Sequence, residues 1–165
     1  MSEAVTEPVY PLPPAGFNMR MMTADDLAQV IAIEREAQLT PWGEQSFLDA
    51  IVANDILPVV LHQDQVVAYG VLKMMWEEAE ILNLVVAQEW RRHGLGRFLV
   101  RHLVRSAGLN GAQKVFLEVR ESNTGAQKLY EQEDFSIFGK RIGYYETEDG
   151  REDALLMRWV HNDEA

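Results

Sequence analysis

The sequence contains no cysteine, which excludes disulfide bonds, thiolate metal ligands and a cysteine nucleophile. It also lacks any uncharged apolar run close to the roughly 18 residues that a membrane-spanning helix needs, so no membrane partner is expected. Basic residues are scarce: 15 Lys and Arg stand against 26 Asp and Glu, which gives a formal charge of −11. This negative charge opposes binding to duplex nucleic acid, because such binding depends on neutralising phosphates.

The beginning of the chain lacks the apolar periodicity of a folded segment. Four of the six prolines fall within residues 1–16, which predicts an extended, proline-rich N-terminal arm. Glu3 and Glu7 stand where a secretory signal would carry basic residues, so no such signal is expected and the cytoplasm is the expected compartment. The chain has 165 residues, of which 47% are hydrophobic, and this is enough for one domain with a sizeable core. We therefore expect residues 17–165 to form a single domain.

Apolar spacing divides this domain into strands and helices. Thr23 and Asp26 resemble a capping box at the start of a helix that runs to about residue 37. Further helices are expected around Phe47 and Leu48, over about 95–109 with Asn110-Gly111 at its end, and over about 122–133. Strands are expected over 17–22, 56–61, 66–75, 81–86, 114–120, 135–145 and 154–160. Together these elements predict an α+β fold with a mixed, mostly antiparallel central sheet flanked by helices.

A loop with two glycines separates a predicted strand from a predicted helix. Its sequence is Arg91-Arg92-His93-Gly94-Leu95-Gly96. The first turn of a helix leaves N–H groups unpaired, and glycine allows a phosphate to approach the backbone closely. Five arginines and no acidic residue fall within 91–105, which favours a bound anion over a turn that is merely shaped by glycine. Leu99 in place of a third glycine excludes the Rossmann fingerprint, and Arg97 in place of lysine excludes a P-loop.

Several motifs together resemble the GCN5-related N-acetyltransferase (GNAT) family. Arg91-x-x-Gly94-x-Gly96 looks like the acetyl-coenzyme A pyrophosphate loop of that family, which reads Arg/Gln-x-x-Gly-x-Gly/Ala. The resemblance to the RimI-type branch covers roughly Met19 to Trp159 and rests on Leu82-Asn83-Leu84-Val85-Val86, Leu117-Glu118-Val119-Arg120-x-Ser122-Asn123, Leu129-Tyr130 and Gly150-Arg151-Glu152-Asp153-Ala154. The sequence departs from the family pattern at Ala87-Gln88, where Asp-Pro is usual, and in its additional arm.

The resemblance implies the GNAT fold and the use of acetyl-CoA as a co-substrate. It implies transfer of the acetyl group to the α-amino group of an N-terminal alanine, in this branch on a small-subunit ribosomal protein. Without the resemblance, Asn123 would be interpreted as an ordinary helix cap. The coenzyme-binding residues that the resemblance implies are Leu84, Val85, Val86, Arg91, Arg92, His93, Gly94, Leu95, Gly96, Arg97 and Asn123.

Two residues are implied for proton transfer. Glu118 interrupts an apolar strand on the same face as Phe116 and Arg120, and the resemblance makes it the general base. The pattern alone is equally typical of a strand-end glutamate that is paired with Arg120 or faces solvent. Tyr130 lies about two helical turns after Asn123, and the resemblance makes it the acid that protonates the departing thiolate. The pattern alone is more typical of a buried core tyrosine.

Two segments with aromatic residues are expected to bind the substrate. The resemblance points to Pro41-Trp42 and Tyr144-Tyr145 as the walls of a slot for a free N-terminus, with Trp42 and Tyr144 as the binding residues. Plain packing would explain these aromatic residues equally well. The acidic residues within 146–153 are typical of a solvated hairpin, and they would also attract a basic ribosomal substrate.

Two alternative functions fit the same residues. An acetyltransferase of this fold that acts on a small amine, such as a polyamine or an amino sugar, would also suit the acidic surface. A non-catalytic acyl-CoA-binding module would need only the glycine loop, whereas the presence of both Glu118 and Tyr130 favours catalysis. The segment 150–154 with Tyr144-Tyr145 favours a peptide substrate. The four histidines lack metal-ligand spacing, so no metal is expected, and the sequence does not indicate an oligomeric state.

Overall fold

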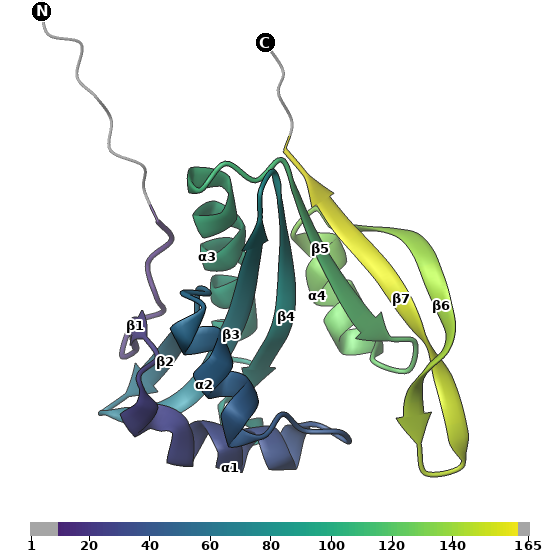
Figure 1. The fold of residues 1–165 in the computed structure, drawn as a ribbon. Helices are drawn as coiled ribbons and strands as arrows, with labels where there is room; N and C mark the ends of the chain where they lie inside the picture. Colours follow the sequence, from purple (N-terminus) through teal and green to yellow (C-terminus); the bar gives the residue numbers. More distant parts are fainter. Residues whose placement is uncertain (1–9, 162–165) are drawn as a thin grey trace, which may run out of the picture.

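The structure is a computed structural model that describes residues 10–161. Within these residues, seven strands form one sheet in the order β1-β2-β3-β4-β5-β7-β6 (Figure 1). Neighbouring strands are antiparallel except β4 and β5, which confirms the predicted α+β class. The strands are β1 (Asn18–Met21), β2 (Pro58–His62), β3 (Gln65–Met75), β4 (Glu78–Val86), β5 (Lys114–Arg120), β6 (Ser136–Thr147) and β7 (Gly150–Val160).

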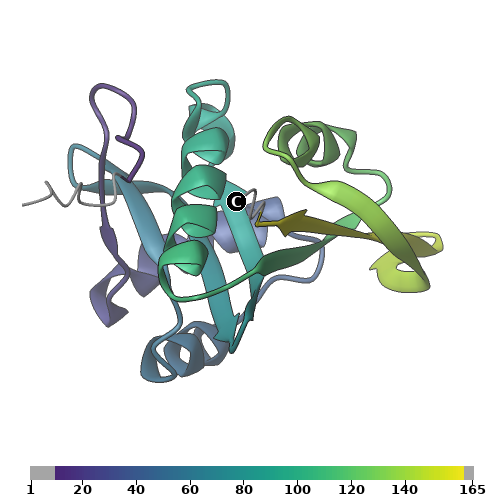
Figure 2. The ribbon, with the colours of Figure 1, turned by 90° about the horizontal axis from the view of Figure 1, so that it is seen from above.

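Helices cover both faces of the sheet. The helices α1 (Leu27–Ala37) and α2 (Glu44–Val52) lie on one face, and α3 (Leu95–Leu109) and α4 (Thr124–Gln132) lie on the other (Figure 2). Two short 3-10 turns, Ala24–Asp26 and Gln88–Trp90, come before α1 and α3. Among the helices of the described residues, none is both long enough and apolar enough to cross a membrane. Of the predicted N-terminal arm, residues 1–9 lie outside the described residues, and 10–16 form neither helix nor strand.

Short-range signals in the sequence set several helix ends. The Asp26 carboxylate accepts a hydrogen bond of 2.8 Å from the Thr23 backbone N–H, as expected for a capping box, and Arg20 donates two further bonds of 2.7 and 2.8 Å to it. Asn123 caps α4, since its side-chain oxygen accepts a first-turn backbone N–H at 3.1 Å. Gly111 follows α3 with a φ of +94°, the left-handed conformation that commonly ends helices.

Three expected boundaries differ from the structure. The strands β4 and β7 begin at Glu78 and Gly150, earlier than their apolar runs indicate. These outer ends are rich in charged residues, Glu78 and Glu80 in β4 and Arg151 to Asp153 in β7, so hydrophobicity does not mark them although their backbones are paired. The turn between β2 and β3 consists of Gln63 and Asp64, one residue earlier than expected. Both residues have positive φ, so this turn adopts the backbone typical of tight hairpins without an Asn-Gly pair.

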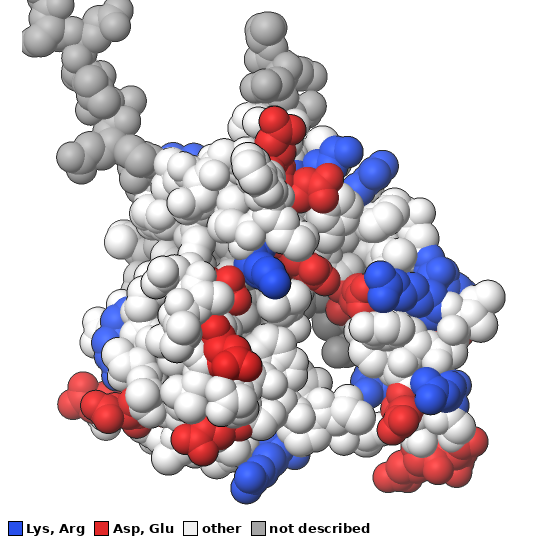
Figure 3. All heavy atoms as spheres, viewed as in Figure 1, with Lys and Arg blue, Asp and Glu red and all other residues white. Residues whose placement is uncertain are grey.

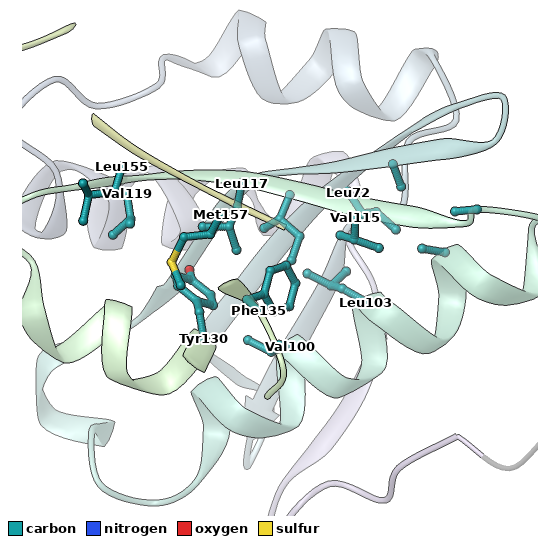
Figure 4. Close-up of a cluster of buried hydrophobic side chains, with 14 residues drawn as sticks. Leu72, Val100, Leu103, Val115, Leu117, Val119, Tyr130, Phe135, Leu155 and Met157 are labelled. Atoms are coloured by element: carbon teal, nitrogen blue, oxygen red, sulfur yellow. The ribbon is translucent and has the colours of Figure 1, made fainter. Parts of the chain in front are cut away.

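The hydrophobic core has one layer on each face of the sheet. Figure 4 shows the layer under α3 and α4, where Tyr130 and Phe135 lie among apolar side chains of β5 and β7. In the other layer, Val30 of α1 and Phe47 of α2 pack against Tyr69 of β3. The predicted two-sided character of α3 is confirmed. Its buried stripe includes Leu95, Phe98, Leu99, His102, Leu103 and Ser106, whereas Arg97, Arg101 and Arg105 are exposed.

The strands β4 and β5 separate part-way along their length. Their parallel pairing covers only Glu78–Ile81 of β4 and Lys114–Leu117 of β5. Leu82, the next residue of β4, forms a bulge, because its two neighbours pair with consecutive residues of β3. Beyond this point the two strands diverge (Figure 1). The separation opens the middle of the sheet, and the candidate site lies in the opening.

Candidate active site

A cavity of about 380 Å³ lies where β4 and β5 separate. Its walls come from the end of α1 and the loop after it, from β4, β5 and β6, and from the start of α4. Figure 3 shows a hollow in this face of the molecule with acidic side chains beside it. The cavity brings together six of the site residues predicted from the sequence: Trp42, Leu84, Glu118, Asn123, Tyr130 and Tyr144.

Glu118 lies on β5 immediately after the last residue that pairs with β4. Its two neighbours in the strand are buried under α3 and α4, so the alternation of the strand turns Glu118 to the opposite face, where it lines the cavity. The side chain retains 19% exposure, and Arg141 of β6 approaches its carboxylate at 3.4 Å. Arg120, the partner that the strand pattern alone suggests, instead binds Glu152 at 2.9 Å.

A second carboxyl group, Glu80 on β4, lines the same cavity. Burial raises the pKa of Glu80, and the negative charge of Glu118 raises it further, whereas Arg141 and Lys73 act in the opposite direction. Glu80 was not among the site residues predicted from the sequence. Its position opposite Phe116 in the β4–β5 ladder, and therefore close to Glu118, depends on a register that no local pattern indicates.

Tyr130 reaches the cavity from the other side of the sheet. It lies on α4 with 8% of its surface exposed, and its ring is 5.8 Å from that of Phe135 (Figure 4). Burial raises the pKa of Tyr130 to about 12, with a smaller contribution from Tyr145. The phenol therefore stays protonated at neutral pH and can act as a hydrogen-bond donor. A carboxylate from one face and a phenol from the other thus line one cavity.

The glycine loop and the first turn of α3, together called the cradle below, lie at the open N-terminal end of that helix. Gly94 has a φ of +78°, Arg92 has a φ of +68°, and a Cβ built on Gly94 would meet nothing within 4 Å. The first intrahelical bond of α3 runs from the Phe98 N–H to the Gly94 carbonyl at 3.0 Å, so the N–H groups of residues 95–97 stand at the open end of the helix. His93 Nδ1 lies 3.0 Å from the carbonyl oxygens of Trp90 and Arg91. This geometry fits a phosphate or pyrophosphate group.

Gly96 and Arg97 also join α3 to α4. A Cβ on Gly96 would come within 3.1 Å of the Leu129 side chain. Close packing of α3 against α4 therefore favours glycine at this position, whether or not a ligand also approaches it. The Arg97 side chain donates to Gln132 at 3.0 Å and lies 3.2 Å from Glu133. The group that Arg97 offers to the cradle is therefore its backbone N–H.

The end of β4 presents its backbone to the opening. Leu84, Val85 and Val86 lie beyond the last β4–β5 pair, so the β4 edge that faces the opening is not paired with β5. Their side chains pack into the core layers, as expected. An unpaired strand edge can accept an extended ligand through its N–H and C=O groups.

Trp42 and Tyr144 lie on two walls of the cavity. Trp42, in the loop between α1 and α2, packs against Phe47 with ring centroids 5.2 Å apart. Tyr144 on β6 is 46% exposed, and the Arg141 guanidinium lies 5.1 Å from its ring centroid. Tyr145 lines the cavity beside Tyr144, with Arg120 over its ring at 4.4 Å.

Glu34 is a cavity residue that sequence reasoning missed. It is fully buried on α1 and binds residues of β3, of β4 and of the loop before α2. A signal for it exists in the sequence, because Glu34 follows Val30 by four residues and Leu27 by seven on the apolar stripe of the helix. Within residues 10–161, no group of three or more His, Asp or Glu side chains is arranged to hold a metal ion.

Comparison with known proteins identifies the family of this chain. Residues 25–135 match the family described as Acetyltransferase (GNAT) family. The chain belongs to this family. Two curated relatives, each described as [ribosomal protein bS18]-alanine N-acetyltransferase, are similar to it. The Escherichia coli K12 protein is 34% identical over 80% of this chain and 89% of its own length, and the Salmonella typhimurium protein is 32% identical over 83% and 93%.

A solved structure shares the fold of this acetyltransferase. The crystal structure of the ribosomal-protein-S18-alanine N-acetyltransferase from Escherichia coli has a TM-score of 0.82 and 30% identity over 90% of this chain and 98% of that one. The expected family and fold are therefore confirmed. The matched range 25–135 includes the glycine loop, Glu118 and Tyr130, whereas Tyr144 lies beyond it.

Proposed function

We propose that this chain transfers the acetyl group of acetyl-CoA to the α-amino group of an N-terminal alanine, on a small-subunit ribosomal protein. The observation that carries the proposal is the placement of Glu118 and Tyr130 on opposite sides of one opening, into which β4 presents an unpaired edge. The substrate named for the relatives supports the choice of an N-terminal alanine. A ribosomal-protein substrate would also place the reaction in the cytoplasm, as the sequence predicts.

The geometry of the residues that the resemblance assigns to the coenzyme supports this part of the proposal. The cradle of Gly94 and the N–H groups of residues 95–97 would hold the pyrophosphate, and the unpaired edge of Leu84 to Val86 would hold the extended arm. Asn123, whose side-chain oxygen caps α4, lines the cavity that also contains Glu118 and Tyr130. When bound, acetyl-CoA supplies the activated acetyl group as a thioester.

Glu118 acts as the general base of the proposed reaction and Tyr130 as its general acid. The Glu118 carboxylate accepts a proton from the substrate ammonium group, directly or through a water molecule, so that the amine can attack. The Tyr130 hydroxyl keeps its proton in the free enzyme and donates toward the sulfur that leaves. The α-amino group suits a modest base, because its reference pKa of about 7.7–8.0 lies well below the value of about 10.4 for lysine. Its deprotonation at neutral pH therefore costs about 3.5 kcal/mol less.

The walls of the cavity suit a cationic chain end. Glu34, Glu80 and Glu118 give its lining an excess of carboxyl groups, which would attract an ammonium group. Trp42 and Tyr144 supply aromatic surface on two walls, where the first residues of a peptide can pack.

Mass spectrometry of two basic peptides tests the proposal. One peptide has a free N-terminal alanine and an internal lysine, and the other is identical but has a blocked N-terminus. We expect one acetyl group on the free peptide and none on the blocked one. Acetylation of both would indicate lysine as the acceptor. Acetylation of neither, while the protein still binds coenzyme, would contradict a peptide substrate and direct the search to small amines or to a purely binding role.

A further inference from the structure

Glu34 is a fully buried carboxylate in the wall of the cavity. Its Oε1 accepts hydrogen bonds from the Tyr69 hydroxyl at 2.6 Å and from Asn83 Nδ2 at 2.9 Å. Its Oε2 accepts the backbone N–H of Trp42 at 2.9 Å. The three donors come from β3, from β4 and from the loop between α1 and α2. One side chain therefore connects the nearby loop to two strands whose donors lie 35 and 49 residues further along the chain.

Hydrogen bonds from three donors surround this buried carboxylate. None of the ion pairs within residues 10–161 involves Glu34. A carboxylate removed from water is costly unless donors surround it, and a well-packed apolar side chain would fill the same place at lower cost. The Tyr69 hydroxyl stays protonated and keeps donating its hydrogen bond, because burial and the adjacent Glu34 both raise its pKa. The carboxylate therefore links the three segments by hydrogen bonds, and it does not pack the core better than an apolar side chain would.

The connection fixes the loop that lines the cavity. Trp42 donates to Glu34 from one end of this loop, and Gln38 Nε2 donates to Asn83 Oδ1 at 3.0 Å from the other. Asn83 itself donates to Glu34, so both ends of the loop join the same network on β4. Gln38, Trp42 and the intervening Thr40 all line the cavity.

We propose that Glu34 is a positioning residue for the peptide: its carboxylate holds the loop of residues 38–42 against β3 and β4 and thereby fixes the wall that receives the first residues of the substrate. The substrate part of this inference rests on the proposed function, whereas the structural part does not. Loss of the connection should weaken the binding of the peptide and leave the coenzyme cradle unaffected, because the cradle lies at the start of α3, beyond the 3-10 turn Gln88–Trp90.

Three variants separate positioning from simple stabilisation. Glu34→Gln replaces one of two acceptor oxygens by a donor NH2 group, so the side chain no longer accepts hydrogen bonds at both ends as the carboxylate does. Gln38→Ala breaks the second attachment of the loop at a partly exposed site, and it tests the network even if Glu34→Gln fails to fold. Tyr69→Phe is the matched control, because it removes a strand-side donor from Glu34 but leaves the bond to the Trp42 N–H.

Two measurements read the outcome. Amide hydrogen exchange at Trp42 should be at least about tenfold faster in Glu34→Gln than in the wild type. The peptide KM should rise about tenfold, which corresponds to about 1.4 kcal/mol, with kcat within about threefold and an unchanged coenzyme Kd. Gln38→Ala should raise the peptide KM in the same direction. Tyr69→Phe should change each quantity by less than about threefold, because the bonds to Glu34 from the Trp42 N–H and from Asn83 remain, even if the variant melts at a lower temperature.

Three results would overturn the inference: unchanged exchange at Trp42 in Glu34→Gln, a loss confined to kcat, or an equal rise of KM in Tyr69→Phe. A wild-type protein that does not acetylate the peptide would refute the proposed function instead. In that case, the exchange of the Trp42 amide still decides whether Glu34 holds the loop.

Discussion

Replacing Tyr130 by phenylalanine should remove the acid of the reaction while preserving the fold. The change deletes one oxygen atom from a side chain that otherwise packs against Phe135 in the core. Loss of a positioned general acid typically lowers a rate by about 10²- to 10⁴-fold, and we expect a loss of kcat in this range. The coenzyme Kd should stay within about twofold, because the cradle on α3 does not include Tyr130.

The pKa of Tyr130 adds a quantitative expectation. A rise from 10.0 to about 12 corresponds to about 3 kcal/mol in favour of the protonated phenol. The wild-type enzyme should therefore show no alkaline loss of kcat due to Tyr130 up to about pH 10. Tyr145, another tyrosine of the cavity with a pKa of about 12, provides a matched comparison. Tyr145→Phe should lower kcat by less than tenfold.

Steady-state kinetics with the alanine peptide between pH 6.5 and 10 would provide the test, with calorimetry for coenzyme binding and thermal melts for the fold. If Tyr130→Phe keeps its kcat within threefold of the wild type and binds coenzyme normally, Tyr130 is not the acid. If Tyr145→Phe loses as much activity as Tyr130→Phe, the effect belongs to the cavity as a whole and the assignment to one hydroxyl group is wrong.

Three further changes test other parts of the molecule. Glu118→Gln should lower kcat/KM for the peptide most strongly near pH 6, where the amine is largely protonated, and a loss that is equal at every pH would contradict a role as base. Asp26→Asn should lower the free energy of unfolding at pH 7 by about 1–2 kcal/mol, because the bonds from Arg20 are charge-assisted but half exposed. Since Arg20 lowers the pKa of Asp26 below 3.8, this stabilisation is present above about pH 4 and is lost as the pH falls through the folded value, so melts of the two proteins should converge in acid. A constant difference between them would refute this linkage. Gly94→Ala places a side chain in the left-handed region at a cost of roughly 1–2 kcal/mol, and calorimetry should show weaker coenzyme binding; unchanged affinity would contradict the cradle.

The predicted site residues that line the cavity are placed there by short-range patterns. Alternation along β5 places Glu118 opposite the buried face, and helical spacing places Asn123 and Tyr130 on the inner side of α4. The interpretation of the loop between β4 and α3 as an anion site needs only its two glycines and the unpaired N–H groups at the start of the helix. Each of these inferences requires only neighbours within about two turns or one strand. The roles of these residues remain predictions.

The missed features depend on long-range pairing. Glu34 acquires its role from Tyr69 and Asn83, which lie 35 and 49 residues further along the chain. The opening itself requires the bulge at Leu82 and the end of the β4–β5 ladder, and the apolar run that contains Leu82 reads as an uninterrupted strand. Arg97 likewise finds partners on α4 that its own helix does not indicate.

The short ladder between β4 and β5 distributes the reaction over two halves of the protein. Glu118 and Tyr130 both belong to the half that begins with β5, whereas the cradle and the open edge of β4 belong to the half that precedes it. If the angle between the halves changed, the proposed base and the proposed acid would move together, because both lie in the second half. Their distances from the cradle and from the loop of residues 38–42 would change, because these lie in the first half. The fold thus keeps the two groups proposed for proton transfer on one half and the groups proposed to hold the acetyl donor on the other.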